Sequence, residues 1–454
     1  MTAPMFRYVP PHPPRPDGPV PVWRGFVGER ARNAVFGWSK RAFEIPHFER
    51  TVLGHRVHIP LDPALVQHVM LDNAANYQKP DLVKKLLMPS IGRGLLSSDG
   101  NLWRDQRRIV AASFAPAAVD ALFPSFARAA EQAMAGWGSG CTIDMAEVST
   151  ATTMRVISDA LFGGDPRLTG AEAMGHIAAA LEGVGGARLQ VLLGLPLIPL
   201  TAKGRRGRRG QLYLRETLSA VVNDRRQRPG DDFLSHMISA LDARFPAEDA
   251  QALAVDNAAT FYVAGHETTA NAMTWTLFLL SEQAALQEQV SAEAREALAA
   301  APADSSLAER LPLLRRVLEE SMRLYPPVPR FDRQAVADDR IGDHPIRAGD
   351  FVSIWPWIIH RHRSLWEDPD AFIPDRWRED ARATRHRFQY IPFGGGPRVC
   401  VGLRFATAEM LSVLAYWLAG WRFAPLPGRD VRPSGMVTLR PAGGLPLILS
   451  RRSG

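Results

Sequence analysis

The stretch Phe393-Gly394-Gly395-Gly396-Pro397-Arg398-Val399-Cys400-Val401-Gly402 holds one of only two cysteines in the chain of 454 residues. This cysteine is framed by glycines, and an apolar, helix-like run follows it from Leu403 to about Leu418. A thiol ionises when positive charge and backbone N–H donors surround it. Glycines let N–H groups approach the sulfur, and the start of a helix adds partial positive charge. The stretch therefore predicts a cysteine placed to act as a ligand.

The same stretch resembles the haem-binding loop of the cytochrome P-450 family, whose pattern is F-x-x-G-x-R-x-C-x-G. The fixed positions of that pattern are all filled, by Phe393, Gly396, Arg398, Cys400 and Gly402. A buried, inert cysteine before a helix is the competing interpretation of a single motif. The resemblance implies that Cys400 binds the iron of haem b and that Phe393 shields the sulfur. It also implies that Arg398 holds a propionate, and that the two glycines let loop and helix approach the porphyrin.

A second pattern lies in a long apolar segment that we expect to be one helix from about residue 248 to residue 280. Its middle reads Ala264-Gly265-His266-Glu267-Thr268, which is similar to the family's oxygen-binding pattern A-G-x-[DE]-T. The resemblance implies that Ala264 and Gly265 lie beside the cofactor, that Thr268 orients water, and that Glu267 relays protons. A zinc peptidase motif would need a second histidine at position 270, which is Ala270. For His266 we expect a core position with a hydrogen bond to the backbone.

Two further features match the family in order along the chain. Trp103 and Arg107 are four residues apart, so they share a helix face. The resemblance implies that this pair binds a haem propionate, with an indole N–H and a guanidinium as donors. It implies a second contact from Arg333, for which Arg330 is the competing candidate. The alternative for the tryptophan is simple packing.

Glu320 and Arg323 are three residues apart on a predicted helix from Leu311 to Tyr325. An exposed pair of this kind is common and contributes little. Apolar neighbours suggest that this pair is buried, and a buried pair needs further hydrogen bonds. The resemblance supplies Arg376 as a third member of a structural clamp behind the cysteine loop, with a role in folding and haem retention.

Composition narrows the class of protein. The net charge is +7 and charged residues make up 22% of the chain, as in an ordinary globular protein. The one basic run, residues 203–209, has no interleaved aromatic residues, so we expect no nucleic-acid binding. If Cys400 binds iron, Cys141 has no partner, which favours a reducing compartment, the cytoplasm. No apolar run of about 20 residues occurs, so no transmembrane anchor is expected.

These features predict a mainly α protein with smaller β-sheets (α+β), with the cytochrome P-450 fold that the resemblance implies. Residues 1–21 are rich in proline and should be extended, and residues 22–454 should form a single domain. Prolines and glycines in residues 79–94 predict an irregular loop. The family places a mobile lid at about residues 186–210, which we favour over contact with a membrane. The segments expected to line an apolar substrate pocket are Leu86–Met88, Leu189–Leu197, Phe261–Ala264, Val328–Phe331 and Met436.

The function that the resemblance implies is a monooxygenase that uses O2 and two electrons to oxidise a lipophilic small molecule. No flavin or iron–sulfur segment is found in the chain, so we expect a separate donor, an acidic ferredoxin or flavodoxin with its reductase. Its docking candidates are Arg104, Arg108, Arg398, Arg404 and the arginines of residues 376–387, and we expect a monomer. A peroxide-driven peroxygenase is a weaker alternative, because such members usually lack the acid–alcohol pair at Glu267 and Thr268. A haem-based sensor would not need that pair either.

Overall fold

The computed structural model describes residues 8–18, 21, 28–52, 54–170, 172–180, 190, 198–199, 201–301, 304–435 and 437–452. These residues belong to two compact units, each built from separate stretches of chain. The first unit comprises residues 1–78, 126–150 and 268–454, and the second comprises residues 79–125 and 151–267. Helices predominate and the sheets are small, which confirms the mainly α, α+β class. The single domain over residues 22–454 stays a prediction.

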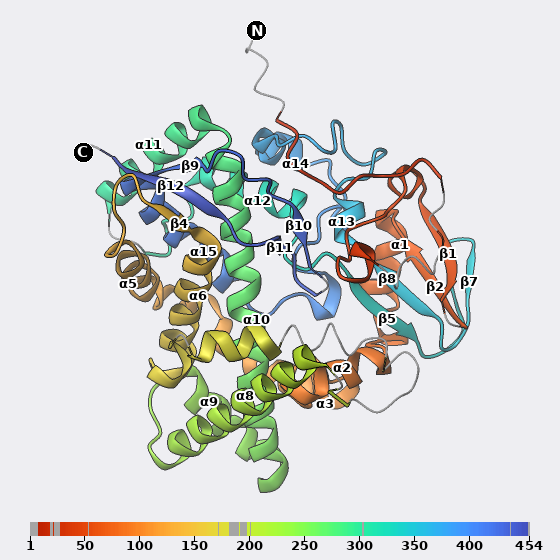
Figure 1. The fold of residues 1–454 in the computed structure, drawn as a ribbon. Coiled ribbons are helices and arrows are strands. Elements are labelled where there is room, and N and C mark those ends of the chain that lie inside the picture. Colours follow the sequence, from red (N-terminus) through yellow and green to blue (C-terminus); the bar gives the residue numbers. More distant parts are fainter. Residues whose placement is uncertain are drawn as a thin grey trace. The chain divides into compact units, whose positions relative to one another are not determined.

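The strands of the described chain all belong to the first unit (Figure 1). A five-stranded sheet has the order β1-β2-β8-β5-β3, in which β2 and β8 are parallel and the other neighbours antiparallel. A second, antiparallel sheet has the order β4-β12-β9, and β6–β7 and β10–β11 are separate pairs. The strands are β1 (His47–Val52), β2 (His55–Pro60), β3 (Tyr77–Gln78), β4 (Thr142–Asp144), β5 (Phe331–Ala335), β6 (Asp339–Ile341), β7 (His344–Ile346), β8 (Phe351–Ile354), β9 (Trp421–Pro425), β10 (Pro433–Ser434), β11 (Arg440–Pro441) and β12 (Pro446–Arg451).

The helices of the first unit are centred on α15, which directly follows the cysteine stretch. Almost every side chain from Ala408 to Leu418 is buried, and α15 packs along α11. The predicted helices after Cys400 and from Leu311 are both confirmed, as α15 and α12. The helices of this unit are α1 (Pro63–Gln67), most of α5 (Phe123–Met134), α11 (Ala284–Ala300), α12 (Pro312–Leu324), α13 (Pro356–Ile359), α14 (Glu379–Arg382) and α15 (Leu403–Gly420).

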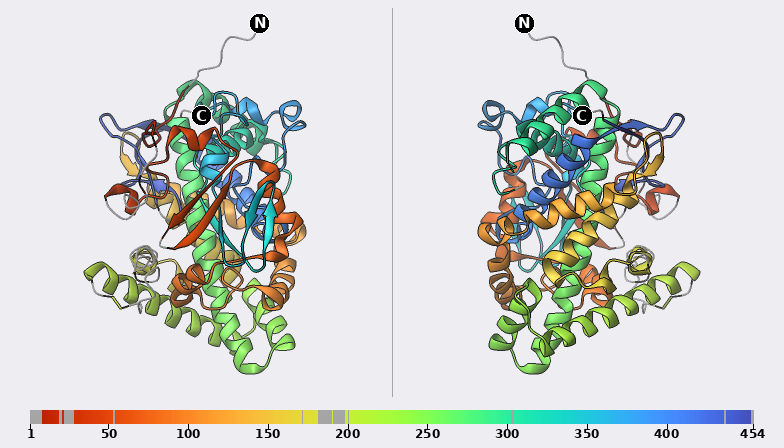
Figure 2. Two further views of the ribbon diagram at one scale, coloured as in Figure 1. Left: turned by 90° about the vertical axis from the view of Figure 1, so that its right-hand side faces the viewer. Right: turned by 90° about the vertical axis from the view of Figure 1, so that its left-hand side faces the viewer.

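The second unit is helical throughout the part that the structure describes. Its helices are α2 (Asp81–Ile91), α3 (Gly100–Ala111), α4 (Pro116–Asp120), most of α6 (Met145–Phe162), α8 (Ala202–Gln227) and α9 (Phe233–Arg244). Helix α10 (Ala247–Ser281) begins in this unit and continues without a break into the first, as the long green helix of Figure 2. Its bounds confirm the long helix that the sequence predicts.

Residues 79–94 do not form the predicted irregular loop, because α2 occupies most of them. Pro80 lies just before the helix, Asp81 provides a favourable negative charge in its first turn, and Gly92 ends it with φ of 51°. Pro89 lies in the last turn of the helix, where its missing N–H removes one hydrogen bond to the preceding turn, and the helix ends two residues later. The same prolines and glycines that suggested a loop therefore mark the two ends of a helix.

Residues 8–18 of the proline-rich segment form no helix, as expected, and lie against other parts of the first unit. Tyr8 forms a β-bridge with Phe372, and the Tyr325 hydroxyl donates a hydrogen bond of 2.7 Å to the Pro11 carbonyl. The Arg15 guanidinium makes two hydrogen bonds, of 2.7 and 2.5 Å, to the Asp370 carboxylate. The segment has no core of its own, and these contacts hold it in place.

None of the described helices has both the length and the apolarity to cross a bilayer by itself. The bent pair formed by residues 100–114 and 116–134 reaches that length and apolarity only when its helices are taken together.

Candidate active site

The cysteine stretch is a closed loop directly before α15. The Cys400 amide donates a hydrogen bond of 2.9 Å to the Phe393 carbonyl, which brings the two ends of the loop together. Gly394 and Gly396 have φ of 73° and 63°, a region that favours glycine. Cys400 is exposed and forms no disulfide, and the N-terminus of α15 follows closely. An accessible sulfur beside a helix N-terminus fits a thiolate that binds haem iron.

Gly396 is required for a second reason, which the sequence does not reveal. A Cβ atom at this position would lie 1.7 Å from the carbonyl oxygen of Met70. Met70 belongs to a single π-helical turn, His68–Asp72, that packs against the loop. At Gly394 a Cβ atom would meet only the Met70 methyl group, at an ordinary 3.8 Å. The loop is therefore held against its own unit at Gly396.

Of the two arginines proposed for the second propionate contact, Arg330 already has an acidic partner. Its Nε atom lies 3.2 Å from an Asp332 carboxylate oxygen, and its guanidinium lies over the Trp355 ring, 5.2 Å from the centroid. Arg333 is half-buried on β5 and donates a hydrogen bond of 3.0 Å to the Asp332 carbonyl. Both arginines are held by Asp332, and which of them meets an anionic ligand stays a prediction.

The middle of α10 differs in exposure from the rest of the helix. Ala264, Gly265, Glu267 and Thr268 are only half-buried, whereas the flanking residues 258–262 and 269–281 are buried. A half-buried stripe between two buried stretches of a helix is what a helix beside a ligand site would present. A Cβ atom at Gly265 would lie 2.6 Å from the Ile157 side chain of α6, so this glycine is also needed for helix packing.

His266 is a core residue, as the sequence predicts. Its Nδ1 atom lies 2.6 Å from the Tyr262 carbonyl, and the Thr153 hydroxyl donates to the His266 carbonyl. Burial lowers the pKa of His266, which keeps the ring neutral. Within the described residues no group of three or more His, Cys, Asp or Glu residues is arranged to hold a metal ion.

Trp103 and Arg107 lie one turn apart on α3, and both are half-buried. These two residues, with Ala264, Gly265 and Glu267, belong to the second unit. The cysteine loop, Arg333 and Thr268 belong to the first unit. Glu267 and Thr268 are consecutive residues of the continuous helix α10. Each unit thus holds its own share of the predicted haem contacts, and their meeting around one cofactor stays a prediction.

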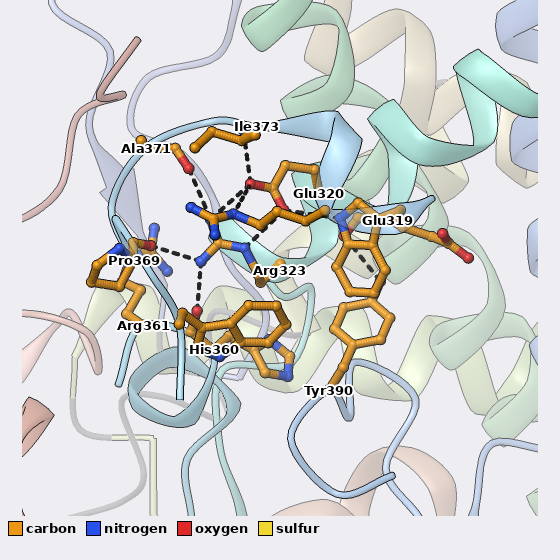
Figure 3. A network of polar contacts seen from close by, with 12 residues as sticks. Glu319, Glu320, Arg323, His360, Arg361, Pro369, Ala371, Ile373 and Tyr390 are labelled. Carbon is orange, nitrogen blue, oxygen red and sulfur yellow. Dashed lines mark hydrogen bonds and ion pairs between the residues drawn. The ribbon is translucent and has the colours of Figure 1, made fainter. Parts of the chain in front are cut away.

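The Glu320–Arg323 pair of the predicted clamp is present and fully buried in the first unit (Figure 3). Arg323 donates two hydrogen bonds of 2.8 Å to the Glu320 carboxylate. It donates three more, of 2.7, 2.7 and 2.9 Å, to the carbonyls of His360, Pro369 and Ala371. These additional bonds satisfy the guanidinium, which is what a buried ion pair requires.

Glu320 has two further donors that the sequence does not identify, and the expected third member, Arg376, lies close to it. It accepts hydrogen bonds of 2.9 Å from the Ile373 amide and from the Trp377 indole N–H, and the Arg376 Nε atom lies 3.4 Å away. Burial, the largest single influence, would raise the pKa of Glu320, but Arg323 and the other donors outweigh it and lower the pKa. Glu320 therefore remains ionised, with a carboxylate surrounded by donors.

The arginines of residues 376–387 are not all available to a redox partner, which corrects part of the predicted docking set. Arg376 belongs to the clamp, and Arg385 is half-buried over the Trp377 ring, 4.4 Å from its centroid. Arg382 forms an ion pair with Glu319. The exposed arginines of the predicted docking set are Arg378, Arg382, Arg387 and Arg404 in the first unit and Arg104 and Arg108 in the second.

The predicted pocket segments have different outcomes. Leu86–Met88 lies in α2, and Phe261–Ala264 lies in α10. Val328–Phe331 leads into β5. Met436 and nearly all of the lid segment before residue 198 lie outside the described residues.

Comparisons with known proteins agree with these features. The chain matches the family described as "Cytochrome P450" over residues 16–445. It is 32% identical over 401 residues to "Cyclooctatin synthase" of Streptomyces melanosporofaciens, covering 87% of each chain. It is 30% identical over 406 residues to "Cyclooctat-9-en-7-ol 5-monooxygenase" of the same organism, covering 87% of this chain and 86% of that one.

A solved structure, the haem domain of cytochrome P450DA, matches with a TM-score of 0.80. The match covers 98% of this chain and 99% of that chain at 23% sequence identity. At this level of identity the likeness concerns the fold alone.

Proposed function

The chain belongs to the cytochrome P450 family, and from this premise we propose that Cys400 is the thiolate ligand of its haem iron. Members of this family are oxidoreductases that use haem iron, O2 and electrons from redox partners to oxidise lipophilic molecules. The observation that carries the assignment is the exposed Cys400 sulfur in a glycine-rich loop at the N-terminus of α15. We propose haem b as the cofactor, because the thioether attachment of c-type haem needs a C-x-x-C-H motif that the sequence lacks.

Four residues are proposed to bind the haem propionates: Arg398, Trp103, Arg107 and Arg333. Guanidinium groups bind carboxylates through two parallel N–H donors, and an indole N–H adds one more. All four side chains are half-buried, as side chains at a ligand surface are. Arg330, which pairs with Asp332, remains the competing candidate for the position of Arg333.

Thr268 and Glu267 are the proposed catalytic residues. The bound haem would supply the activation of O2 and the oxidation of a C–H bond. A Thr268 hydroxyl can hold a water molecule in place, and a half-buried Glu267 can exchange protons with solvent. Ala264 and Gly265, with the smallest side chains on this part of α10, would leave space beside them.

The proposed substrate is a cyclic, hydrocarbon-rich alcohol or a related terpenoid. Support comes from the names of two relatives, a cyclooctatin synthase and a cyclooctat-9-en-7-ol 5-monooxygenase, both at least 30% identical. Apolar residues predominate in the expected pocket segments, including the buried Phe261 of α10.

The proposed electron donor is an acidic ferredoxin or flavodoxin that docks on exposed arginines near the cysteine loop. Arg378, Arg387 and Arg404 are exposed and carry the charge such a partner needs. Reversing all three charges should slow reduction and flatten its salt dependence, while the same change at exposed Arg451 should not. Equal reduction rates in both variants would contradict this docking surface.

We further propose a monomer in the reducing cytoplasm, since the two cysteines form no disulfide. Light scattering on the purified protein gives the mass of the particle in solution and so tests whether it is a monomer.

Two experiments test the assignment of the site. The reduced carbon-monoxide spectrum should show the thiolate-shifted Soret band in the wild-type protein and in Cys141→Ser, and should lose it in Cys400→Ser. A well-folded wild-type protein without this band would remove Cys400 from the iron.

Thr268→Ala should release peroxide while product formation falls, because water is no longer held in place. Its neighbour Thr269 is buried and serves as the control, so Thr269→Ala should keep its coupling. Unchanged coupling in Thr268→Ala would contradict the proton role.

A further inference from the structure

The cysteine loop is anchored at its start by one imidazole ring. Ile391 is buried two residues before Phe393, and its amide donates a hydrogen bond of 2.9 Å to the Nε2 atom of His360. The loop then runs to Cys400, whose amide bonds to the Phe393 carbonyl. The His360 ring thus holds the chain where it enters the loop.

The direction of this bond determines the state of the ring. A backbone amide can only donate, so the Nε2 atom of His360 must be the acceptor and must carry no proton. His360 is completely buried, and this burial, with Arg323 and Arg361 nearby, lowers its pKa well below the ordinary value. A ring that stays neutral keeps its acceptor through the physiological pH range.

The backbone of His360 is held by Arg323 of the clamp, and its ring packs against an aromatic neighbour. The His360 carbonyl accepts a hydrogen bond of 2.7 Å from Arg323, and the ring lies against Tyr390, with centroids 5.2 Å apart. The Tyr390 hydroxyl in turn donates to the Glu319 carbonyl on α12. His360 is therefore the link between the buried Glu320–Arg323 pair and the start of the cysteine loop.

We propose that His360 is a positioning residue for the thiolate: its Nε2 atom fixes the Ile391 amide and so determines how the loop presents Cys400. This inference rests on the proposed role of Cys400 as the iron ligand. The clamp gives His360 its position, and His360 transmits that position to the loop through one hydrogen bond. A side-chain acceptor for the backbone amide at the start of the loop is a stronger restraint than packing alone, because an unpaired buried amide is costly.

Two substitutions at His360 separate the hydrogen bond from the bulk of the ring. The carboxamide of His360→Gln reaches the place of Nε2 and can accept from Ile391, whereas that of His360→Asn reaches only the place of Nδ1. The matched control is His362→Asn, because His362 is also buried and its Nε2 atom lies 3.1 Å from the Ile45 carbonyl, away from the loop.

The first readout is amide hydrogen exchange of the peptide that contains Ile391, in the haem-loaded protein. His360→Asn should exchange at least about tenfold faster there, which is the expected effect of losing one buried hydrogen bond. His360→Gln and His362→Asn should stay close to the wild-type rate. Equal exchange in His360→Asn and wild type would overturn the proposal, as would equal acceleration in His360→Gln and His360→Asn.

The second readout is the reduced carbon-monoxide spectrum of the same proteins. His360→Asn should lose a large share of the thiolate-shifted band, and His360→Gln should recover it. A full thiolate band in His360→Asn would show that the loop does not need this bond, even if the exchange rate changed. If the wild-type protein lacked the band, the role of Cys400 would fail instead, and the exchange data would still report on the loop.

Discussion

The buried clamp offers the sharpest prediction, because neighbouring residues of α12 provide both the test and its control. Glu320 accepts four hydrogen bonds, two from Arg323 and one each from Ile373 and Trp377, with no exposure to solvent. Glu320→Gln keeps the shape of the side chain but turns one oxygen into an NH2 group. Whichever oxygen it replaces, the NH2 group then points at hydrogen-bond donors, and the charged Arg323 loses its negatively charged partner.

Removing one member of a buried ion pair costs about 3–5 kcal/mol, because the remaining charge is left uncompensated. The bidentate geometry and the fully buried position place Glu320→Gln within this range. Glu319 pairs with Arg382 and Arg315 at the edge of the same helix, where the arginine side chains are 40% and 45% exposed. Glu319→Gln should therefore cost only up to about 1 kcal/mol.

The assay is equilibrium unfolding in urea, with circular dichroism and haem absorbance as two probes. We expect the midpoint of Glu320→Gln to fall by several times the shift seen in Glu319→Gln, with haem lost at lower urea. Similar losses in the two variants, within about 0.5 kcal/mol, would refute the view that the buried pair is the clamp.

Acid should reproduce the effect of the substitution in the wild-type protein. The pKa of Glu320 is lower in the folded protein than in the unfolded chain, so the carboxylate stabilises the fold above the unfolded pKa of about 4.3. This stabilisation is lost as the pH falls from there through the folded pKa. Glu320→Gln should lack that part of the pH dependence.

Three more predictions follow from other parts of the fold. Gly396→Ala should disorder the cysteine loop, since its Cβ atom would lie 1.7 Å from a carbonyl oxygen. Gly394→Ala should cost only the strain of positive φ, about 1–2 kcal/mol. Similar haem contents in the two variants would count against the steric argument. Glu409 is completely buried without a hydrogen-bond partner among the described residues, and burial raises its pKa well above the ordinary value. Because the folded protein then keeps a proton that the unfolded chain releases above pH ~4.3, stability falls as the pH rises above that value. Glu409→Gln should remove this slope, and a parallel pH profile for the variant would contradict a protonated Glu409. Arg15→Ala should lower the stability by about 2 kcal/mol and expose the N-terminal segment to protease. Lys40→Ala loses only an exposed ion pair and should have neither effect. Equal protease sensitivity in the two variants would contradict a docked segment.

The parts of the site that the sequence predicts are those in which neighbours in space are neighbours in the chain. The cysteine loop and the helix after it, the pattern in the middle of α10, and the Glu320–Arg323 pair all depend on residues within one or two turns of backbone. Local geometry determines such arrangements, since residues three or four apart on a helix always share a face. The core position of His266 is predictable for the same reason, because its partner Tyr262 is one turn away.

The helix over residues 81–91 shows where local signals lose their meaning. Proline and glycine are common both in irregular loops and at helix ends, so Pro80, Pro89 and Gly92 do not distinguish the two. Which of the two forms is chosen depends on packing with other segments, so the sequence pattern alone gives the wrong answer here.

The sequence by itself determined the cysteine loop, the long helix and the family to which the chain belongs. Tertiary structure alone decided which distant groups hold these parts in place: Met70 against Gly396, His360 on the Ile391 amide, Trp377 on Glu320, and Arg15 on Asp370. The physical reason is that a buried charge or amide needs a partner of the right kind, and a chain with 54 basic and 47 acidic residues offers many. Only the packing of segments far apart in the chain selects one of them.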